Sequence, residues 1–270
     1  MLNQLNKLEE YILSREADNI KQVLFFGAPK SCSSYVEQRF RENKPNRFFY
    51  PGHGVFDKEF FKISDSYFSA SKIGPATFTS LKEFVSVNRK KYTLSFSVIR
   101  NPYDYFVSLY THGDFGAYNC AHRLRRPLHA CPAKKHKVLF KRFILENLLK
   151  VKEFPFLQLQ AHPWFYLFYN GVCQPELIFK KEMLAAQCDI LQKRFNLAGA
   201  DPGLINMAAT RPLRSSGDDW REWWDEDMIE AFYSFFKSVF VNLGYKKDGT
   251  TEKDKSYLLG KDLTLNVEKL

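Results

Sequence analysis

The sequence predicts an α/β fold with a central, mainly parallel sheet flanked by helices. Three strand candidates span residues 22–27, 92–99 and 176–179, and the first is a short apolar run that ends at a glycine, typical of a buried strand in a parallel sheet. Each candidate is followed by a stretch of helical character, over residues 35–40, 102–110 and 183–195. Strands that alternate with helices in this way are the pattern of layered α/β domains.

The two ends of the chain lie outside this alternating pattern. Residues 1–19 predict an amphipathic helix, because their apolar residues recur at helical spacing. Residues 225–242 predict a last long helix, which ends at Gly244 as its C-cap. We therefore expect one domain over residues 1–270, with a core at about 22–245, an N-terminal helix at 1–19 and a polar C-terminal tail at 246–270.

The composition limits the class of protein and its partners. Of the 270 residues, 45% are hydrophobic, which excludes a disordered chain, and 40 Lys and Arg against 30 Asp and Glu give a net charge of +10. That charge attracts nucleic acid, an anionic membrane surface or a highly phosphorylated small molecule. No apolar run reaches the length of a membrane span or forms a signal peptide, and the odd count of five Cys fits a reducing compartment. The prediction is a cytoplasmic protein.

Small residues follow the first predicted strand and lead into a helix, a segment that we call the first corner (residues 27–35). Backbone N–H groups at a helix start, together with the helix dipole, form a site for an anion. Lys30 adds a positive charge, and Ser33 and Ser34 add hydroxyl donors. The spacing is not that of the Walker phosphate loop. The alternative is a solvated, serine-rich turn.

A second set of anion-binding residues follows the second predicted strand, and we call residues 99–108 the second corner. Asn101 can cap a helix in which Pro102 occupies the first turn. The guanidinium of Arg100 and the hydroxyl of Ser108 suit a phosphate, which arginine binds with two hydrogen bonds. The alternative is a structural salt bridge between Arg100 and Asp104. Two such corners predict one ligand that carries two separated phosphates.

These residues resemble the sulfotransferase family. The segment from Pro29 to Tyr35 resembles the family's 5′-phosphosulfate loop, and the segment from Arg100 to Tyr110 resembles its 3′-phosphate motif. Residues 220–245 resemble the C-terminal helix of many members, so that the similarity spans about residues 22–245. The resemblance implies a P-loop-NTPase-like three-layer sandwich and a sulfotransferase that uses 3′-phosphoadenosine 5′-phosphosulfate.

The resemblance also implies roles for individual residues. Lys30 would contact the phosphosulfate, main-chain N–H groups and serine hydroxyls would surround the 5′-phosphate, and Arg100 with Ser108 would hold the 3′-phosphate. The implied donor-binding residues are Lys30, Ser31, Cys32, Ser33, Ser34, Tyr35, Arg100 and Ser108. The chain departs from the family at three places. Cys32 stands where many members carry Gly, Tyr35 stands where cytosolic members often carry Trp, and the late Arg-x-Lys-Gly motif is not evident.

The chemistry of sulfuryl transfer requires an in-line displacement with positive charge near the leaving oxygen, which points to Lys30 as a catalytic residue and requires no metal. An acceptor hydroxyl also needs a base, for which we choose His53. It lies between Gly52 and Gly54, in a context that resembles the catalytic-histidine region of some carbohydrate-type sulfotransferases. An exposed turn histidine is the alternative for His53. Other candidates for the base are His112, Asp57 and Glu59.

Several segments have structural alternatives to a functional role. Cys120, His122, His129 and Cys131 could meet a zinc ion, but their spacing matches no common zinc module, and an acceptor-side loop is the preferred interpretation. Residues 123–142 carry eight Lys or Arg, which we expect on a solvated face. A stripe of seven rings is expected in the core rather than in the acceptor pocket: Trp220, Trp223, Trp224, Phe232, Phe235, Phe236 and Phe240.

The predicted acceptor is a small molecule or saccharide, and the sequence leaves open its identity and whether an oxygen or a nitrogen is sulfated. It also leaves open whether the protein forms a homodimer. Nucleic acid is not expected as a partner, because no aromatic residues stand out among the cations. Two other functions are weighed. A kinase with a degenerate phosphate loop would depend on magnesium and ATP, and a non-catalytic polyanion-binding protein would exploit the +10 charge.

Overall fold

The computed structural model describes the chain in ten segments, and its residues group into two compact units. The described segments are residues 2–14, 23–27, 32–43, 48–49, 94–111, 133–148, 167–169, 172–199, 219–252 and 255–263. The first unit comprises residues 1–100, 163–202 and 252–270, and the second comprises residues 101–162 and 203–251. The predicted organisation as a single domain stays a prediction.

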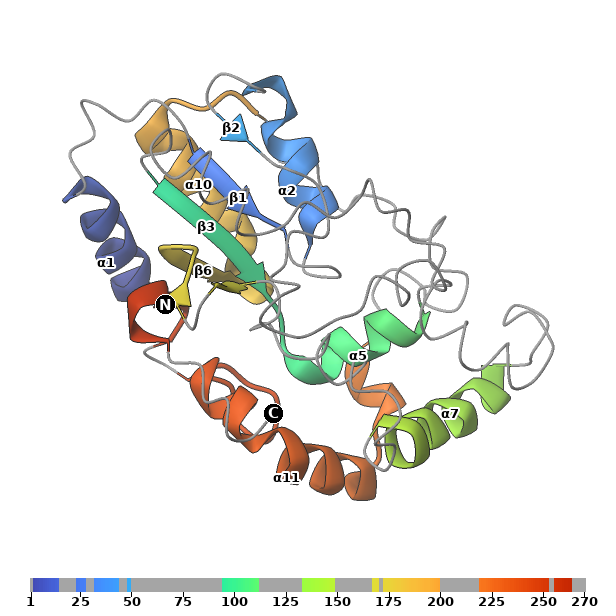
Figure 1. Ribbon diagram of the computed structural model, residues 1–270. Helices are drawn as coiled ribbons and strands as arrows, with labels where there is room; N and C mark the ends of the chain where they lie inside the picture. The colour runs from blue at the N-terminus through green and yellow to red at the C-terminus, as the bar shows by residue number, and fades with distance from the viewer. Residues whose placement is uncertain are drawn as a thin grey trace. The chain divides into compact units, whose positions relative to one another are not determined.

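A five-stranded sheet forms the centre of the first unit (Figure 1). Its strands, in spatial order, are β2 (Phe48–Phe49), β1 (Val23–Phe26), β3 (Leu94–Ile99), β6 (Leu177–Lys180) and β7 (Tyr257–Leu259). The first four are parallel, and β7 runs antiparallel to β6. This arrangement confirms the predicted α/β class with a mainly parallel sheet, and β1, β3 and β6 are the three strands expected from the sequence.

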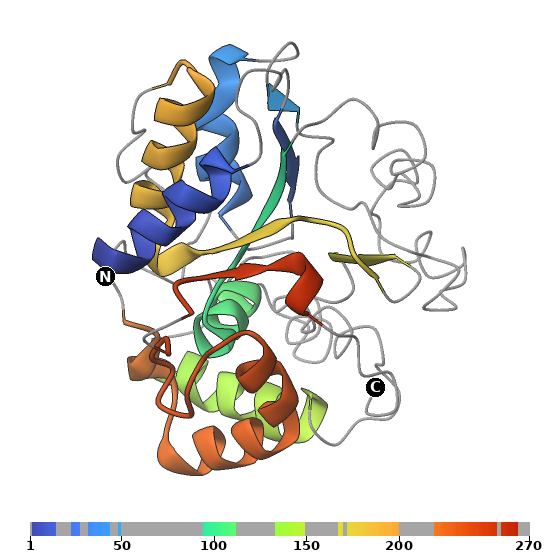
Figure 2. The same cartoon turned by 90° about the vertical axis from the view of Figure 1, so that its left-hand side faces the viewer.

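Three helices cover one face of this sheet: α1 (Leu2–Leu13), α2 (Ser33–Phe40) and α10 (Leu184–Phe195) (Figure 2). Alternate strand residues face these helices, so that the rings of Phe25 and Phe96 lie 4.9 Å apart between centroids. The apolar helix residues that pack on this face are Leu8, Ile12, Val36, Phe40, Leu184, Cys188 and Leu191. The second helical layer of the predicted sandwich stays a prediction.

The first unit contains two features that the sequence did not predict. Residues 246–270 were expected as a polar tail, but Tyr257–Leu259 of this segment form β7 and pair with β6. The unit also holds a small antiparallel hairpin of β4 (Phe168–Tyr169) and β5 (Val172–Cys173). After β7 the chain turns through the short helix η9 (Gly260–Asp262). Its first residue, Gly260, lies so close to Pro175 that a Cβ there would clash with the Pro175 carbonyl oxygen.

The described residues of the second unit are mainly helical. Their helices are α5 (Pro102–Thr111), α7 (Ala133–Arg142), the π-helical turn η5 (Phe143–Leu148), η8 (Trp220–Trp223) and α11 (Glu226–Asn242). Its core is aromatic, since the buried ring of Tyr103 lies 4.9 Å from Trp220, 4.8 Å from Trp224 and 4.9 Å from Phe240 between centroids. This confirms the core assignment of most of the ring residues in this stretch, although Phe235 is 48% exposed.

Helix α11 begins and ends with sequence-encoded caps. The Asp225 side chain accepts a hydrogen bond from Met228 N at 2.9 Å. At the other end Gly244 has a left-handed φ of 66°, and Tyr245 N donates to Phe240 O at 2.8 Å, which is the pattern of a Schellman cap. The predicted helix and its end at Gly244 are therefore confirmed. In the part of the chain that the structure describes, no helix combines the length and the apolar character needed to cross a bilayer.

Candidate active site

The order of the strands brings the ends of β1 and β3 together. Strand β1 pairs with β2 on one side and with β3 on the other, so the strand order reverses at β1. In open parallel sheets, ligands bind outside the carboxyl ends of the strands at such a switch point. Register pairs Phe26 with Ser97, and Ser97 Oγ donates to Phe26 O at 2.6 Å. The first corner and Arg100 thus follow neighbouring strand ends, as the two-phosphate hypothesis requires.

In the first corner, helix α2 begins without a capping side chain. Cys32 is its N-cap residue, with a left-handed φ of 61°, and its side chain makes no capping hydrogen bond. The first helical bond runs from Val36 N to Cys32 O at 3.1 Å. The N–H groups of the residues from Ser33 to Tyr35 therefore precede the first helical bond, and N–H groups in such a position point along the axis toward a bound anion.

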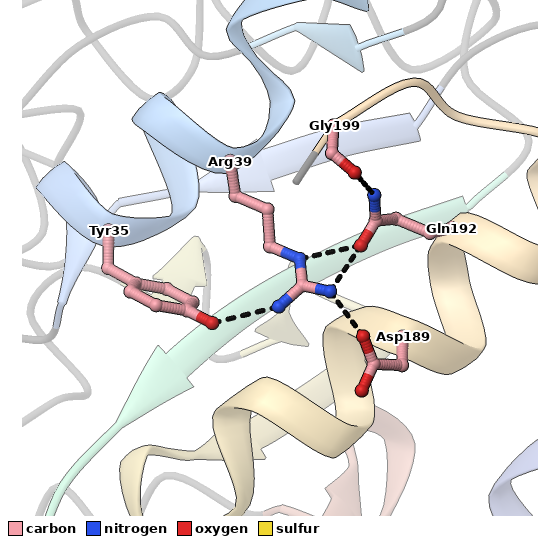
Figure 3. Close-up of polar contacts among 5 residues, drawn as sticks. All are labelled: Tyr35, Arg39, Asp189, Gln192 and Gly199. Atoms are coloured by element: carbon pink, nitrogen blue, oxygen red, sulfur yellow. Dashed lines mark hydrogen bonds and ion pairs between the residues drawn. The ribbon is translucent and has the colours of Figure 1, made fainter. Parts of the chain in front are cut away.

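The buried side chain of Arg39 connects this helix to α10 (Figure 3). Its Nη1 donates to the Tyr35 hydroxyl at 2.8 Å, and its Nε donates to Gln192 Oε1 at 2.7 Å. Nη2 forms an ion pair with Asp189 and also donates to Gln192. Burial opposes the charged form, but the hydrogen bonds to Tyr35 and Asp189 outweigh it and raise the pKa of Arg39. Arg39 was not among the residues predicted from the sequence.

In the second corner, Arg100 directly follows β3 and is 3% exposed. Asn101 caps α5, because its Oδ1 accepts a hydrogen bond from Tyr103 N at 2.9 Å, while its Nδ2 donates to Gly249 O at 2.7 Å. This confirms the predicted cap. Ser108 is buried on α5 and belongs to the second unit, so its contact with a nucleotide stays a prediction. The salt bridge with Asp104 stays an alternative.

A third cationic residue lies at the same edge of the sheet. Lys180 ends β6, is paired in register with Ile99 of β3 and is fully buried. Its backbone N–H donates to Gln187 Oε1 at 3.2 Å. Burial lowers the pKa of its ammonium group to about 7, although the negative charges of Glu182 and Glu252 oppose the shift. Neighbouring strands β3 and β6 therefore both lead into buried basic residues, and the lowered pKa leaves Lys180 only partly charged near pH 7.

Several predicted residues lie outside the described part of the chain. They are Lys30, Ser31, His53, the other candidate bases His112, Asp57 and Glu59, and the array of Cys120, His122, His129 and Cys131. Their roles stay predictions. Within the described segments, no group of three or more His, Cys, Asp or Glu could hold a metal ion. The basic stretch is described from Ala133 onward, where it forms α7, and Lys137 and Arg142 on this helix are exposed.

Comparison with known proteins identifies the family. The model of the sulfotransferase family matches residues 17–203, which is more than half of the chain and includes both corners. The chain belongs to the sulfotransferase family. This sulfotransferase has no match among the curated proteins or the solved structures that were searched. The family assigns it to the transferases and favours sulfuryl transfer over the kinase and polyanion-binding alternatives.

Proposed function

We propose that this sulfotransferase moves a sulfuryl group from 3′-phosphoadenosine 5′-phosphosulfate to a hydroxyl or amine of a small-molecule or saccharide acceptor. The product of the donor is then adenosine 3′,5′-bisphosphate. The observation that carries the proposal is the arrangement of the two corners, which follow the adjacent parallel strands β1 and β3 at the switch point of the sheet. A nucleotide with phosphates on both sides of its ribose suits two anion sites at one sheet edge.

The residues present fit such a donor. The first turn of α2 is part of the first corner, and the Cys32 side chain does not cap it, so that no capping side chain would compete with a phosphate there. Arg100 supplies a guanidinium at the neighbouring strand end, and burial keeps it out of bulk water, where its attraction for a phosphate would be weaker. The net charge of +10 also attracts a donor with several negative charges.

In this proposal, two residues of the chain carry the chemistry of transfer. The donor supplies a sulfuryl group bonded to a phosphate oxygen. Lys30 stabilises the negative charge that develops on that oxygen as its bond to sulfur breaks. His53 takes up the proton that an acceptor hydroxyl loses when its oxygen bonds to the sulfur. Arg100 and the first turn of α2 bind and orient, which is the main requirement of in-line group transfer.

Thermal unfolding with nucleotides tests the donor assignment. We expect adenosine 3′,5′-bisphosphate to raise the melting temperature, because a ligand at 100 times its Kd stabilises the folded state by about 2.7 kcal/mol. Adenosine 5′-monophosphate, which lacks the 3′-phosphate, should raise it less. The variant Arg100→Lys keeps the charge but loses the planar guanidinium with its paired N–H donors. In this variant, the two nucleotides should differ less in the melting temperature that they give. No stabilisation by saturating bisphosphate would contradict the proposal.

The role of His53 is tested separately from donor binding. The variant His53→Ala should keep the stabilisation by adenosine 3′,5′-bisphosphate but lose about 10²–10⁴-fold in the transfer rate, the usual contribution of a placed base. The rate is measured by mass spectrometry on a metabolite extract supplied with isotope-labelled donor. Unchanged transfer would assign the base to another residue, with His112 as the next to be replaced.

A further inference from the structure

We infer that Arg39 is a positioning residue of the donor site, which holds the Tyr35 hydroxyl against α10 and so fixes the direction of the first turn of α2. The inference rests on the proposed function, since the first turn of α2 is the part of the chain proposed to meet the 5′-phosphate. Arg39 itself contacts no reacting group in this proposal. It acts through Tyr35, which lies one helical turn earlier on the same side of α2.

The contacts of Arg39 run in two directions from a single guanidinium (Figure 3). Toward the first corner, Nη1 donates to the Tyr35 hydroxyl at 2.8 Å, and the guanidinium carbon lies 6.0 Å from the centre of the Tyr35 ring. Toward α10, Nε donates to Gln192 Oε1 at 2.7 Å, and Nη2 pairs with Asp189. The fork therefore connects the start of α2 with a helix about 150 residues further along the chain.

Gln192, the partner of Arg39 on α10, is itself hydrogen-bonded on its other side. Its Nε2 donates to the carbonyl oxygen of Gly199 (Figure 3). The backbone at Gly199 lies so close to α2 that a Cβ there would clash with the Arg39 carbonyl oxygen. In the short 3-10 turn that follows α2 (Arg41–Asn43), Asn43 Oδ1 accepts a hydrogen bond from Ala198 N at 2.8 Å. The end of α2 is thus fixed by Asn43, and its first turn is fixed through Arg39 and Tyr35.

A short helix needs such contacts to hold its direction. Helix α2 has eight residues, and isolated helices of this length are unstable in water. Its orientation therefore depends on tertiary contacts. Phosphate binding by backbone N–H groups depends on that orientation, because a displacement of about 1 Å is enough to weaken the contacts of a bound ligand markedly. Loss of the Arg39 fork should consequently appear at the nucleotide site, and not only in the stability of the fold.

The test measures the affinity for adenosine 3′,5′-bisphosphate by calorimetry, at a temperature well below the melting point of each variant. We expect Arg39→Lys, which keeps the charge but loses the fork, to weaken binding about tenfold, and Tyr35→Phe to weaken it about three- to tenfold. The double variant should bind as weakly as Arg39→Lys alone, because both changes remove the same link.

Arg194 provides the matched control. It lies on α10, the helix that Arg39 contacts from α2, and it forms an ion pair with Glu9 of α1 rather than with a residue of α2. The variant Arg194→Lys should lower the melting temperature while leaving the nucleotide affinity unchanged. If it weakens binding as much as Arg39→Lys does, general loosening of α10 explains both, and the positioning role is overturned.

The remaining outcomes separate the inference from the proposed function. If the unaltered protein does not bind the bisphosphate, the proposed function fails and the positioning role fails with it. If the unaltered protein binds the bisphosphate and both single variants bind it as tightly as the unaltered protein does, only the positioning role is overturned. Additive effects in the double variant would also overturn it, because Tyr35 would then act independently of Arg39. Should Arg39→Lys fail to fold, Tyr35→Phe decides alone.

Discussion

The two corners begin their helices in opposite ways. At the second corner, the Asn101 side chain caps α5 through Tyr103 N and also holds Gly249, so the chain itself closes the start of the helix. At the first corner, Cys32 makes no side-chain cap and adopts a left-handed backbone. For the proposed donor site, this comparison predicts a division of labour, in which the first corner binds through backbone groups and the second through the side chain of Arg100.

The largest test of this division removes the charge of the first corner. We expect Lys30→Ala to lower kcat about 10²–10³-fold, the usual cost of losing one group that stabilises developing negative charge. Its affinity for adenosine 3′,5′-bisphosphate should fall much less, because the backbone of α2 and Arg100 remain. Initial rates and calorimetry measure the two quantities. A kcat within a few-fold of the unaltered protein would show that the first corner only binds.

The next test concerns Lys180, whose strand end lies beside the second corner. The pKa of its ammonium group is lowered to about 7 from 10.5 by burial. Below pH 7 both states carry the proton, and burying the charge lowers the free energy of unfolding. Between pH 7 and 10.5 the unfolded chain keeps a proton that the folded chain has lost, so the free energy of unfolding rises with pH, by up to about 1.4 kcal/mol per unit.

Urea unfolding at pH 7 and pH 9 measures this dependence. The variant Lys180→Met should remove it, whereas replacing the exposed Lys261 by Met should leave it in place. Equal stability of the unaltered protein at the two pH values would mean that Lys180 keeps its charge in the folded chain, as an exposed lysine does.

A smaller effect is expected from the cap of the second corner. Asn101→Ala should lower the free energy of unfolding by about 1–2 kcal/mol, because it removes the capping bond to Tyr103 N. Asn101→Asp keeps an acceptor for that bond but loses the donor to Gly249. Its stability should therefore lie between that of the unaltered protein and that of Asn101→Ala. Denaturant unfolding compares the three proteins. An Asp variant as unstable as the Ala variant would show that the capping bond contributes little.

The smallest effect is expected at the cap of the first corner. Cys32→Gly should raise the free energy of unfolding by about 0.5 kcal/mol, because a left-handed backbone strains a residue with a Cβ by more than the added chain entropy of glycine costs. Asn196 is the matched position, with a φ of 47° at the C-cap of α10, and asparagine tolerates this conformation. Asn196→Gly should therefore change the stability less. Equal gains at both positions would contradict a specific strain at Cys32.

The elements that could be predicted are those whose signals are local. Strand β1 is a continuous apolar run, β3 and β6 are short and mainly apolar, and the cap residues Asn101 and Gly244 act within a few positions of their own sequence. Strand β7 has three residues in a charged segment, and it exists because β6 offers an edge about 80 residues earlier in the chain. Only the tertiary fold contains that information.

The same distinction separates the predicted part of the site from the part that was missed. Arg100 could be placed at a strand end because the apolar run before it ends there. The adjacency of β1 and β3 could be proposed only from two similar motifs, and the register shows it directly. Arg39 lies in an ordinary helical stretch, and its partners are 150 and 153 residues away, so no pattern in the sequence marks it.

The last strand of the sheet lies beyond the segment that the family model matches, which ends at residue 203. A fragment cut at that point would keep both corners but leave β6 as an open edge with a row of unsatisfied backbone donors and acceptors. Such edges recruit strands from other molecules and cause aggregation. By pairing with β6, residues 257–259 therefore cover an edge that would otherwise be open to aggregation.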